Sequence, residues 1–196
     1  MQIIFASANA HKASEIQAMV PNGLIVTTMD SVGIVEAIPE PFDTLHENAA
    51  AKAEYVFQKL GLACFSEDSG LEIDALDGKP GVHSAHYAGP NRNAQDNMHK
   101  VLSELHGNTN RKAQFRTIIH AIIQGEHHQF EGIVHGTIAE FPQGENGFGY
   151  DPIFIPDGYG HTFGELDADV KLSISHRSRA FEAFLLFLER RPDLFN

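Results

Sequence analysis

Apolar residues follow two different spacings along this chain, and each spacing predicts a type of secondary structure. Residues 2–6 and 23–28 are short apolar runs of strand length. Residues 10–20 repeat apolar side chains every three or four positions, as one face of an α-helix does. Asn9 stands directly before this segment and is predicted to cap it. The chain therefore opens as strand, helix and strand.

Three further helices are predicted from the same periodicity. The segment Thr44-Leu45-His46-Glu47 has the form of a capping box, and the helix that follows it is expected to end at Gly61. Helices over about residues 93–106 and 173–191 complete the set.

The remaining apolar runs have strand length. Two short strands, residues 62–66 and 71–73, are predicted to flank an acidic turn, Glu67 to Gly70. Two longer runs, residues 113–124 and 129–140, are predicted to form a hairpin through Gly125-Glu126-His127-His128. Helices mixed with crossover strands and a hairpin indicate an α/β fold with a mixed sheet, in a single domain over residues 1–196.

Composition narrows the function classes. The 196 residues include 14 Lys and Arg against 26 Asp and Glu, for a net charge of -12, so the chain lacks the basic surface that nucleic-acid binding needs. The single cysteine, Cys64, lies in an apolar run and has no partner for an internal disulfide. We expect a cytoplasmic protein with no membrane association.

Three cations stand at the edges of the apolar helical stripes, which is unusual for charged residues. They are Lys12, Lys52 and Arg177. Lys12 also lies in the first turn of a helix that directly follows a strand, where free backbone N–H groups favour an anion. We interpret the three as a clasp for phosphate groups, although each alone is compatible with a long side chain that lifts its charge to water.

Two carboxylates and two aromatic residues extend this candidate site. Glu40 stands between prolines and Asp68 at the end of a strand, where both are candidates to hold Mg²⁺ against phosphate; the alternative is a pair of solvated acids. Phe148 and Tyr150 lie on a glycine-rich loop on which a base could stack, with core packing as the alternative. The P-loop and dinucleotide-binding spacings are absent.

Taken together, these residues make the chain resemble the Ham1/RdgB family of inosine/xanthosine triphosphate pyrophosphatases. The resemblance covers nearly the whole length and rests on ordered blocks: Ser7-Ala8-Asn9-Ala10-His11-Lys12, Glu47-Asn48-Ala49 with Lys52, Asp68-Ser69-Gly70-Leu71, Pro80-Gly81-Val82, Ser84-Ala85-His86-Tyr87-Ala88-Gly89, Gly147-Phe148-Gly149-Tyr150-Asp151-Pro152 and Ile174-Ser175-His176-Arg177.

The resemblance implies a two-lobed mixed sheet flanked by helices with a central nucleotide-binding cleft, a homodimer, and Mg²⁺-dependent hydrolysis of dITP, ITP or XTP to the monophosphate and pyrophosphate. Asp68 would be the proton acceptor and, with Glu40, a metal ligand. The substrate would contact these residues: Ser7, Asn9, Lys12, Lys52, Ser69 and Lys171, and at the base Phe148, Gly149, Tyr150, Asp151, His176 and Arg177.

Three positions depart from the family pattern: His86 replaces an arginine, Leu172 an asparagine or serine, and Pro41-Phe42 a Thr-Gly pair. These departures leave two alternatives open, a nucleotide-binding module that has lost turnover and a hydrolase of another modified nucleotide.

Overall fold

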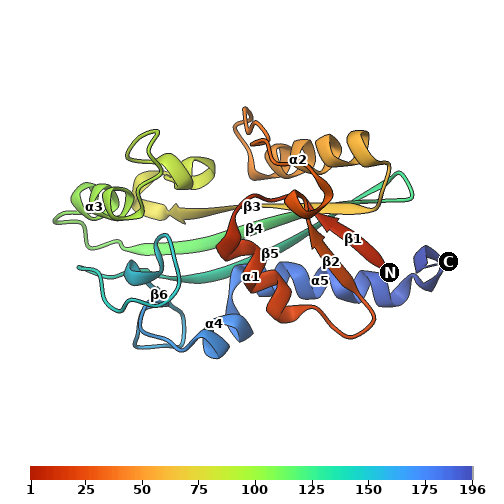
Figure 1. Ribbon diagram of the computed structural model, residues 1–196. Helices are drawn as coiled ribbons and strands as arrows, with labels where there is room; N and C mark the ends of the chain where they lie inside the picture. The colour runs from red at the N-terminus through yellow and green to blue at the C-terminus, as the bar shows by residue number, and fades with distance from the viewer. Residues whose placement is uncertain (196) are drawn as a thin grey trace. The chain divides into compact units, whose positions relative to one another are not determined.

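The computed structural model describes residues 1–195 (Figure 1). Its strands are β1 (Gln2–Phe5), β2 (Ile25–Thr28), β3 (Cys64–Ile73), β4 (Lys112–Ile123), β5 (Glu126–Ile138) and β6 (Phe154–Pro156). Its α-helices are α1 (Ala10–Met19), α2 (Leu45–Leu60), α3 (Ala94–Glu104), α4 (Ala168–Ile174) and α5 (His176–Arg190). None of the helices in this range combines the length and the apolar character needed to cross a membrane.

Within residues 1–195 the strands form a six-stranded sheet in the order β2-β1-β3-β4-β5-β6. β1 pairs in parallel with β2 and with β3, whereas β5 and β6 are antiparallel. The mixed α/β sheet predicted from the sequence is therefore confirmed.

The chain separates into two compact units. Unit 1 comprises residues 1–68, residues 117–132 and the chain from residue 177 onward, and unit 2 comprises residues 69–116 and 133–176. The single domain predicted over residues 1–196 stays a prediction, and each unit is described by itself below.

Unit 1 is layered, with helices on both faces of its strands (Figure 1). On one face, Phe5 and Phe65 stack at 4.8 Å and pack with α1 and with the aromatic side chains of α5. On the other face, Ile4 and Cys64 pack against Ala53 of α2 and its neighbours. Since successive side chains of a strand point to opposite faces, β3 must direct its next residues alternately toward α1 and α5 and toward α2.

Unit 2 has its own core of aromatic and aliphatic side chains. Phe115 of β4 lies 4.7 Å from the ring of Phe154 on β6, and Phe163 packs beside both. Met98 and Val101 of α3 close this core, so the apolar face predicted for that helix is buried.

Local caps formed as the sequence predicts. Asn9 accepts a hydrogen bond from the backbone N–H of Lys12 at the start of α1. Thr44 accepts from the N–H of Glu47, and its hydroxyl donates to the Glu47 carboxylate. Gly61 ends α2 in the left-handed conformation, with φ of 65°.

The acidic turn predicted at residues 67–70 is wrong, because β3 runs without interruption from Cys64 to Ile73. Two adjacent buried carboxylates normally destabilise a strand. Here cations from the helices neutralise each of them. Gly70 also permits a close approach that other residues would block, because a Cβ there would collide with the carbonyl of Gly81. β3 therefore continues through Glu67 and Asp68 instead of ending before them.

Two other boundaries differ from the prediction. The last predicted helix, over about residues 173–191, is α5, which begins only at His176 because Ser175 adopts an extended conformation with ψ of 158°; the preceding helix α4 was not predicted. The hairpin turn between β4 and β5 is shorter than expected. Gln124 and Gly125 both have positive φ, 53° and 81°, which matches a two-residue turn and places His127 and His128 in β5.

Candidate active site

A first group of predicted residues lies in unit 1, at the carboxyl end of β1, where this strand pairs in parallel with the first residues of β3. The backbone N–H of Ala6, directly after β1, donates to the carbonyl of Phe65 at 2.7 Å, so the turn after β1 lies beside the first half of β3. In this turn Ser7 accepts from the N–H of Asn9, and Asn9 caps α1. Ligands of open α/β sheets bind at such edges, and the helix N-terminus adds a favourable site for an anion.

The carboxylate of Glu67 is completely buried on the α1 and α5 face of β3. It pairs with Lys12 Nζ at 3.0 Å and accepts from Arg177 Nε at 2.7 Å and Nη2 at 3.0 Å. Burial raises the pKa of Glu67, but Arg177 and Lys12 outweigh burial and hold the pKa well below its usual range. Glu67 is thus an ionised carboxylate shared by two of the predicted binding cations.

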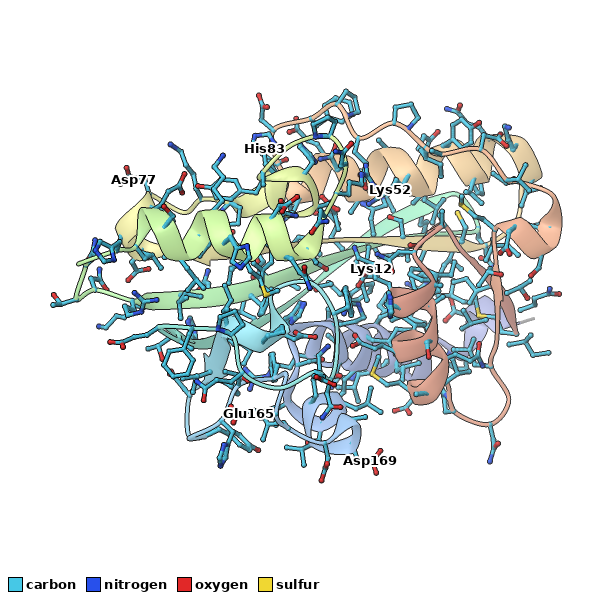
Figure 2. All side chains as sticks on the ribbon, turned by 60° about the vertical axis from the view of Figure 1, so that its left-hand side comes forward. Lys12, Lys52, Asp77, His83, Glu165 and Asp169 are labelled. Atoms are coloured by element: carbon cyan, nitrogen blue, oxygen red, sulfur yellow. The ribbon has the colours of Figure 1, made fainter. Side chains whose placement is uncertain are left out.

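Asp68, the next residue, points to the opposite face of β3, where it meets Lys52 of α2. Lys52 Nζ donates to Asp68 Oδ1 at 3.1 Å and also to Glu40 Oε1. Figure 2 shows Lys52 on α2 and Lys12 on α1. Burial lowers the pKa of Lys52, but the two carboxylates outweigh burial and raise it above the usual value. Burial also raises the pKa of Asp68, and Glu40 adds to this increase against the opposing charges of Lys52 and Lys12.

The loop that carries Glu40 is fastened to α2. Asn48, which is 2% exposed, accepts from the backbone N–H of Phe42 and donates to the Phe42 carbonyl, each at 3.0 Å. Before Glu40, Glu36 accepts from the hydroxyl of Tyr55 on the same helix at 2.6 Å. These contacts hold both ends of the loop, although Pro41-Phe42 replaces the usual residues there.

The residues of this cluster fit a divalent cation that also binds substrate phosphates. Glu40 and Asp68 already converge on one positive charge, the ammonium of Lys52. In residues 1–195 there is no group of three or more His, Cys, Asp or Glu side chains suited to hold a metal ion by themselves. Mg²⁺ commonly uses only one or two protein carboxylates and completes its shell with water and phosphate oxygens, so the two carboxylates suit Mg²⁺.

A second group of predicted residues lies in unit 2, on the glycine-rich loop. Asp151 is buried and pairs with Lys171 of α4 at 2.6 Å, and it accepts from the backbone N–H of Phe148 at 2.7 Å. Lys171 Nζ also lies 4.9 Å from the centre of the Phe148 ring. Gly147 permits this packing, since a Cβ there would collide with the Asp151 carboxylate. The ion pair thereby fixes the loop that carries Phe148.

The other predicted base contacts have different surroundings. His176 is buried at the start of α5 and stacks on Phe115, with ring centres 4.6 Å apart. Tyr150 is 5% exposed in the unit 2 core, and its hydroxyl donates to the carbonyl of Ser84 at 2.8 Å. Gly149 has a φ of 65°, and Ser69 is half-buried on β3.

His86 is exposed at the end of a short 3₁₀ helix, Gly81–His86, in which Ser84 is buried. Asn97 of α3, which is buried, holds the chain on either side of it by accepting from the N–H of Ala88 at 2.7 Å and donating to the carbonyl of Ala85 at 3.1 Å. The departure from arginine therefore falls on a position whose backbone is well anchored.

Comparison with known proteins shows the family of this chain. The model of the Ham1 family matches residues 3–187. The chain belongs to the Ham1 family. It is 46% identical over 185 residues to a dITP/XTP pyrophosphatase of Flavobacterium johnsoniae, with 94% of this chain and 96% of the relative covered. It is 43% identical to the dITP/XTP pyrophosphatase of Bacillus subtilis, with 96% and 97% covered.

Solved structures of Ham1 proteins have the same fold. The Ham1 protein of Staphylococcus aureus matches with a TM-score of 0.89 and 36% identity over 97% of this chain and 100% of its own. The HAM1 protein of Coxiella burnetii matches with a TM-score of 0.90 and 35% identity over 97% and 99%. The α/β architecture is therefore that of the Ham1 family.

Within this Ham1 protein the predicted residues fall into two groups, one in each unit. The unit 1 cluster comprises Ser7, Asn9, Lys12, Glu40, Lys52, Asp68 and Arg177, and the unit 2 cluster comprises Ser69, Phe148, Gly149, Tyr150, Asp151, Lys171 and His176. Lys171, for which a contact with the triphosphate stays a prediction, pairs with Asp151 and lies beside the Phe148 ring in unit 2.

The sequence interpretation missed several residues that hold these clusters. Glu67 was read only as part of an acidic turn, and Asn48 only as part of a family motif. The available signal for Glu67 was its place beside Asp68 in a run of buried residues, where alternation sends the two carboxylates to opposite faces. For Asn48 the signal was weaker, because its partner Phe42 lies in an irregular loop.

Proposed function

We propose that this protein is a nucleoside-triphosphate pyrophosphatase that hydrolyses the non-standard purine nucleotides dITP, ITP and XTP to the monophosphate and pyrophosphate. The observation that carries the proposal is the unit 1 cluster, in which Lys52 lies between Glu40 and Asp68 at the strand edge that also presents Lys12. The activity printed for the relatives from Flavobacterium johnsoniae and Bacillus subtilis supports it.

The triphosphate would bind through cations and backbone N–H groups. Lys12 and the N-terminus of α1 offer positive charge beside an exposed turn, and Ser7 and Asn9 offer short polar side chains there. Lys52 is buried enough for its charge to act strongly. In our proposal these groups stabilise the negative charge that develops on the departing pyrophosphate.

Asp68 would hold the attacking water and accept its proton. Burial raises the pKa of Asp68 in the metal-free protein, but Mg²⁺ bound to the same carboxylate would lower it, so the main role of Asp68 would be to hold the water in position. The hydrogen bond from Lys52 fixes the Oδ1 atom of Asp68, which leaves the orientation of the carboxylate defined. Attack of this water on the α-phosphorus would break the bond to pyrophosphate.

We propose Mg²⁺ as the cofactor, held by Glu40 and Asp68 together with phosphate oxygens of the substrate. When bound, it would neutralise phosphate charge and help to ionise the attacking water. Glu40 and Asp68 would then bind the metal ion in place of some of their present contacts with the Lys52 ammonium.

The base would be recognised in unit 2. Phe148 offers a ring for stacking, Asp151 and Lys171 are polar groups at its loop, and His176 stacks on Phe115 in the same unit. We expect a 6-oxo purine such as hypoxanthine or xanthine to bind better than adenine, whose 6-amino group is a donor and would leave buried donors unpaired.

We further propose that the protein acts as a homodimer in the cytoplasm on free nucleotides, and not on nucleic acid or at a membrane. The net charge of -12 opposes binding to a phosphate backbone. Cys64 is buried and forms no disulfide in the described part of the chain, which suits a reducing compartment.

One assay tests the proposal. The protein is incubated with Mg²⁺ and, separately, with dITP, ITP, XTP, dGTP, dUTP and ATP, and pyrophosphate and orthophosphate are both measured. We expect pyrophosphate from the first three substrates at rates at least about 10²-fold above those for ATP. Binding without turnover would indicate a nucleotide-binding module, and preference for another nucleotide would indicate a different hydrolase.

A further inference from the structure

Glu67 has no role in the chemistry proposed above, yet it lies at the centre of the cations of unit 1. Its Oε1 atom pairs with Lys12 Nζ and with Arg177 Nη2, both at 3.0 Å, and its Oε2 atom accepts from Arg177 Nε at 2.7 Å. Its side chain and that of Arg177 are 0% and 1% exposed. Burying a carboxylate costs folding free energy unless its partners are well placed. A function for Glu67 would explain why this carboxylate is buried here.

Arg177 makes Glu67 rigid. The guanidinium binds Glu67 through two of its nitrogens, a planar geometry that fixes the carboxylate plane. On its other side Arg177 donates to Glu15 of α1. Because Lys12 is on the same helix, Arg177 and Glu67 fasten the first turns of α1 to β3.

Lys12 gains most from this rigid partner. Its side chain is 15% exposed and belongs to the helix that follows the exposed Ser7-to-Asn9 turn. A lysine has four rotatable side-chain bonds and, without a partner, would sample many positions. The contact with Glu67 selects one of them, at the strand edge where the triphosphate is proposed to bind.

Glu67 is poorly suited to act as a metal ligand or base itself. It points to the face of β3 opposite Asp68, and its oxygens already carry contacts with two cations. Its contribution must pass through the residues that it holds.

We propose that Glu67 is a positioning residue of the hydrolytic reaction, which holds the ammonium of Lys12 in place for the triphosphate while Arg177 fixes Glu67. This inference rests on the proposed function. It predicts a loss in kcat without a rise in KM. Loss of the Glu67 charge removes repulsion toward the polyanionic substrate, so KM should stay or fall, whereas the loss of a fixed Lys12 should lower kcat.

The test is a double-mutant cycle measured with dITP, using Glu67→Gln and Lys12→Met. We expect Glu67→Gln to lower kcat at least about tenfold in the wild-type background, and less than about threefold when Lys12 is already methionine. Equal factors in the two backgrounds would overturn the proposal, because the effect would then not pass through Lys12. A rise in KM that accounts for the whole loss would also overturn it.

Folding is controlled separately. Glu67→Gln leaves Arg177 with less compensation, and its Tm should fall by on the order of 10 °C. If this variant does not fold, Glu67→Asp takes its place in the cycle, since it keeps the charge but withdraws the carboxylate from Lys12.

The matched control is Glu15→Gln, which removes the other carboxylate on Arg177. We expect its kcat to stay within about threefold of wild type, and an equal loss in both variants would contradict the route through Lys12.

Failure of the inference and failure of the proposed function give different results. A wild-type protein that releases no pyrophosphate from dITP would refute the function itself. A fully active wild type with an additive cycle would refute only the role of Glu67.

Discussion

At the scale of single residues, two adjacent carboxylates of the same strand have different environments. Glu67 points toward α1 and α5 and is neutralised by Arg177, whereas Asp68 points toward α2 and shares Lys52 with Glu40. The alternation of side chains along β3 is sufficient to separate them. The pKa of the Glu67 carboxyl is therefore lowered, which keeps it ionised, whereas the pKa of the Asp68 carboxyl is raised.

The first prediction concerns Asp68. Asp68→Asn should lower kcat by at least about 10²-fold, since asparagine neither accepts the proton nor holds a divalent cation well. Nucleotide binding should largely persist, because the cations of unit 1 remain. Steady-state kinetics and calorimetric titration with dITP measure the two effects. The control is Asp77→Asn, at an exposed aspartate with positive φ that asparagine also tolerates; near-normal kcat in Asp68→Asn would refute the assigned role.

Lys52→Met should impair both activity and stability. Removal of the ammonium should lower kcat/KM at least about tenfold. It also leaves Asp68 and Glu40 facing each other, and loss of one partner of a buried pair costs about 3–5 kcal/mol of unfolding free energy. Lys112→Met, at an exposed lysine, is the control.

The stability loss in Lys52→Met should depend on pH. Without the lysine, burial and the neighbouring charge keep the pKa of Asp68 above its unfolded value of 3.8. The folded state then binds more protons than the unfolded state, so its stability falls as the pH rises from about 4 through the raised folded pKa. Chemical denaturation at pH 4.5 and pH 7.5 measures this difference. A variant whose deficit is the same at both values would contradict the assigned contact.

At the scale of elements, the sequence predicted what depends on local contacts. The caps at Asn9 and Thr44 and the end of α2 at Gly61 need only neighbouring residues, and all three are present. The continuity of β3 could not be predicted in the same way. It depends on cations from three helices and on the approach of Gly81 to Gly70, contacts between positions distant in sequence.

Gly70→Ala tests the continuous strand. A Cβ at Gly70 would collide with the backbone carbonyl of Gly81, which cannot move as a flexible side chain does. We expect the unfolding free energy to fall by about 2 kcal/mol or more, as for overpacked sites. Gly160→Ala is the matched control, because its Cβ would have no described atom within 4 Å. Equal stability of the two variants, measured by denaturant titration, would show that β3 and this loop are not closely packed.

The loop that carries Glu40 should depend on Asn48. Asn48→Ala removes both hydrogen bonds to the backbone of Phe42, and the expected loss is about 1–3 kcal/mol of unfolding free energy. A displaced Glu40 should also raise the Mg²⁺ concentration for half-maximal activity several-fold. Gln58→Ala, on the exposed side of the same helix, should change neither quantity. An unchanged Mg²⁺ requirement with reduced stability would limit Asn48 to a structural role.

At the scale of the whole molecule, the candidate residues are divided between two compact units. Unit 1 contains the residues predicted for the triphosphate and the metal, and unit 2 contains the Phe148 loop with Asp151 and Lys171. The sequence motifs indicated which residues take part, but they did not indicate this grouping. Lys171 illustrates the limit, since only the folded chain shows that it pairs with Asp151.

This grouping predicts how variants change substrate choice. Every nucleoside triphosphate presents the same phosphates, so Lys12→Met should lower kcat/KM for ITP and ATP by similar factors and leave their ratio within about threefold of wild type. Lys171→Met disturbs Asp151 and the Phe148 loop and should change the ratio at least about tenfold. Both substrates are measured on one preparation, so any inactive or unfolded fraction cancels in the ratio. A changed ratio in Lys12→Met together with an unchanged ratio in Lys171→Met would place base recognition in unit 1 and contradict the proposed roles of the two units.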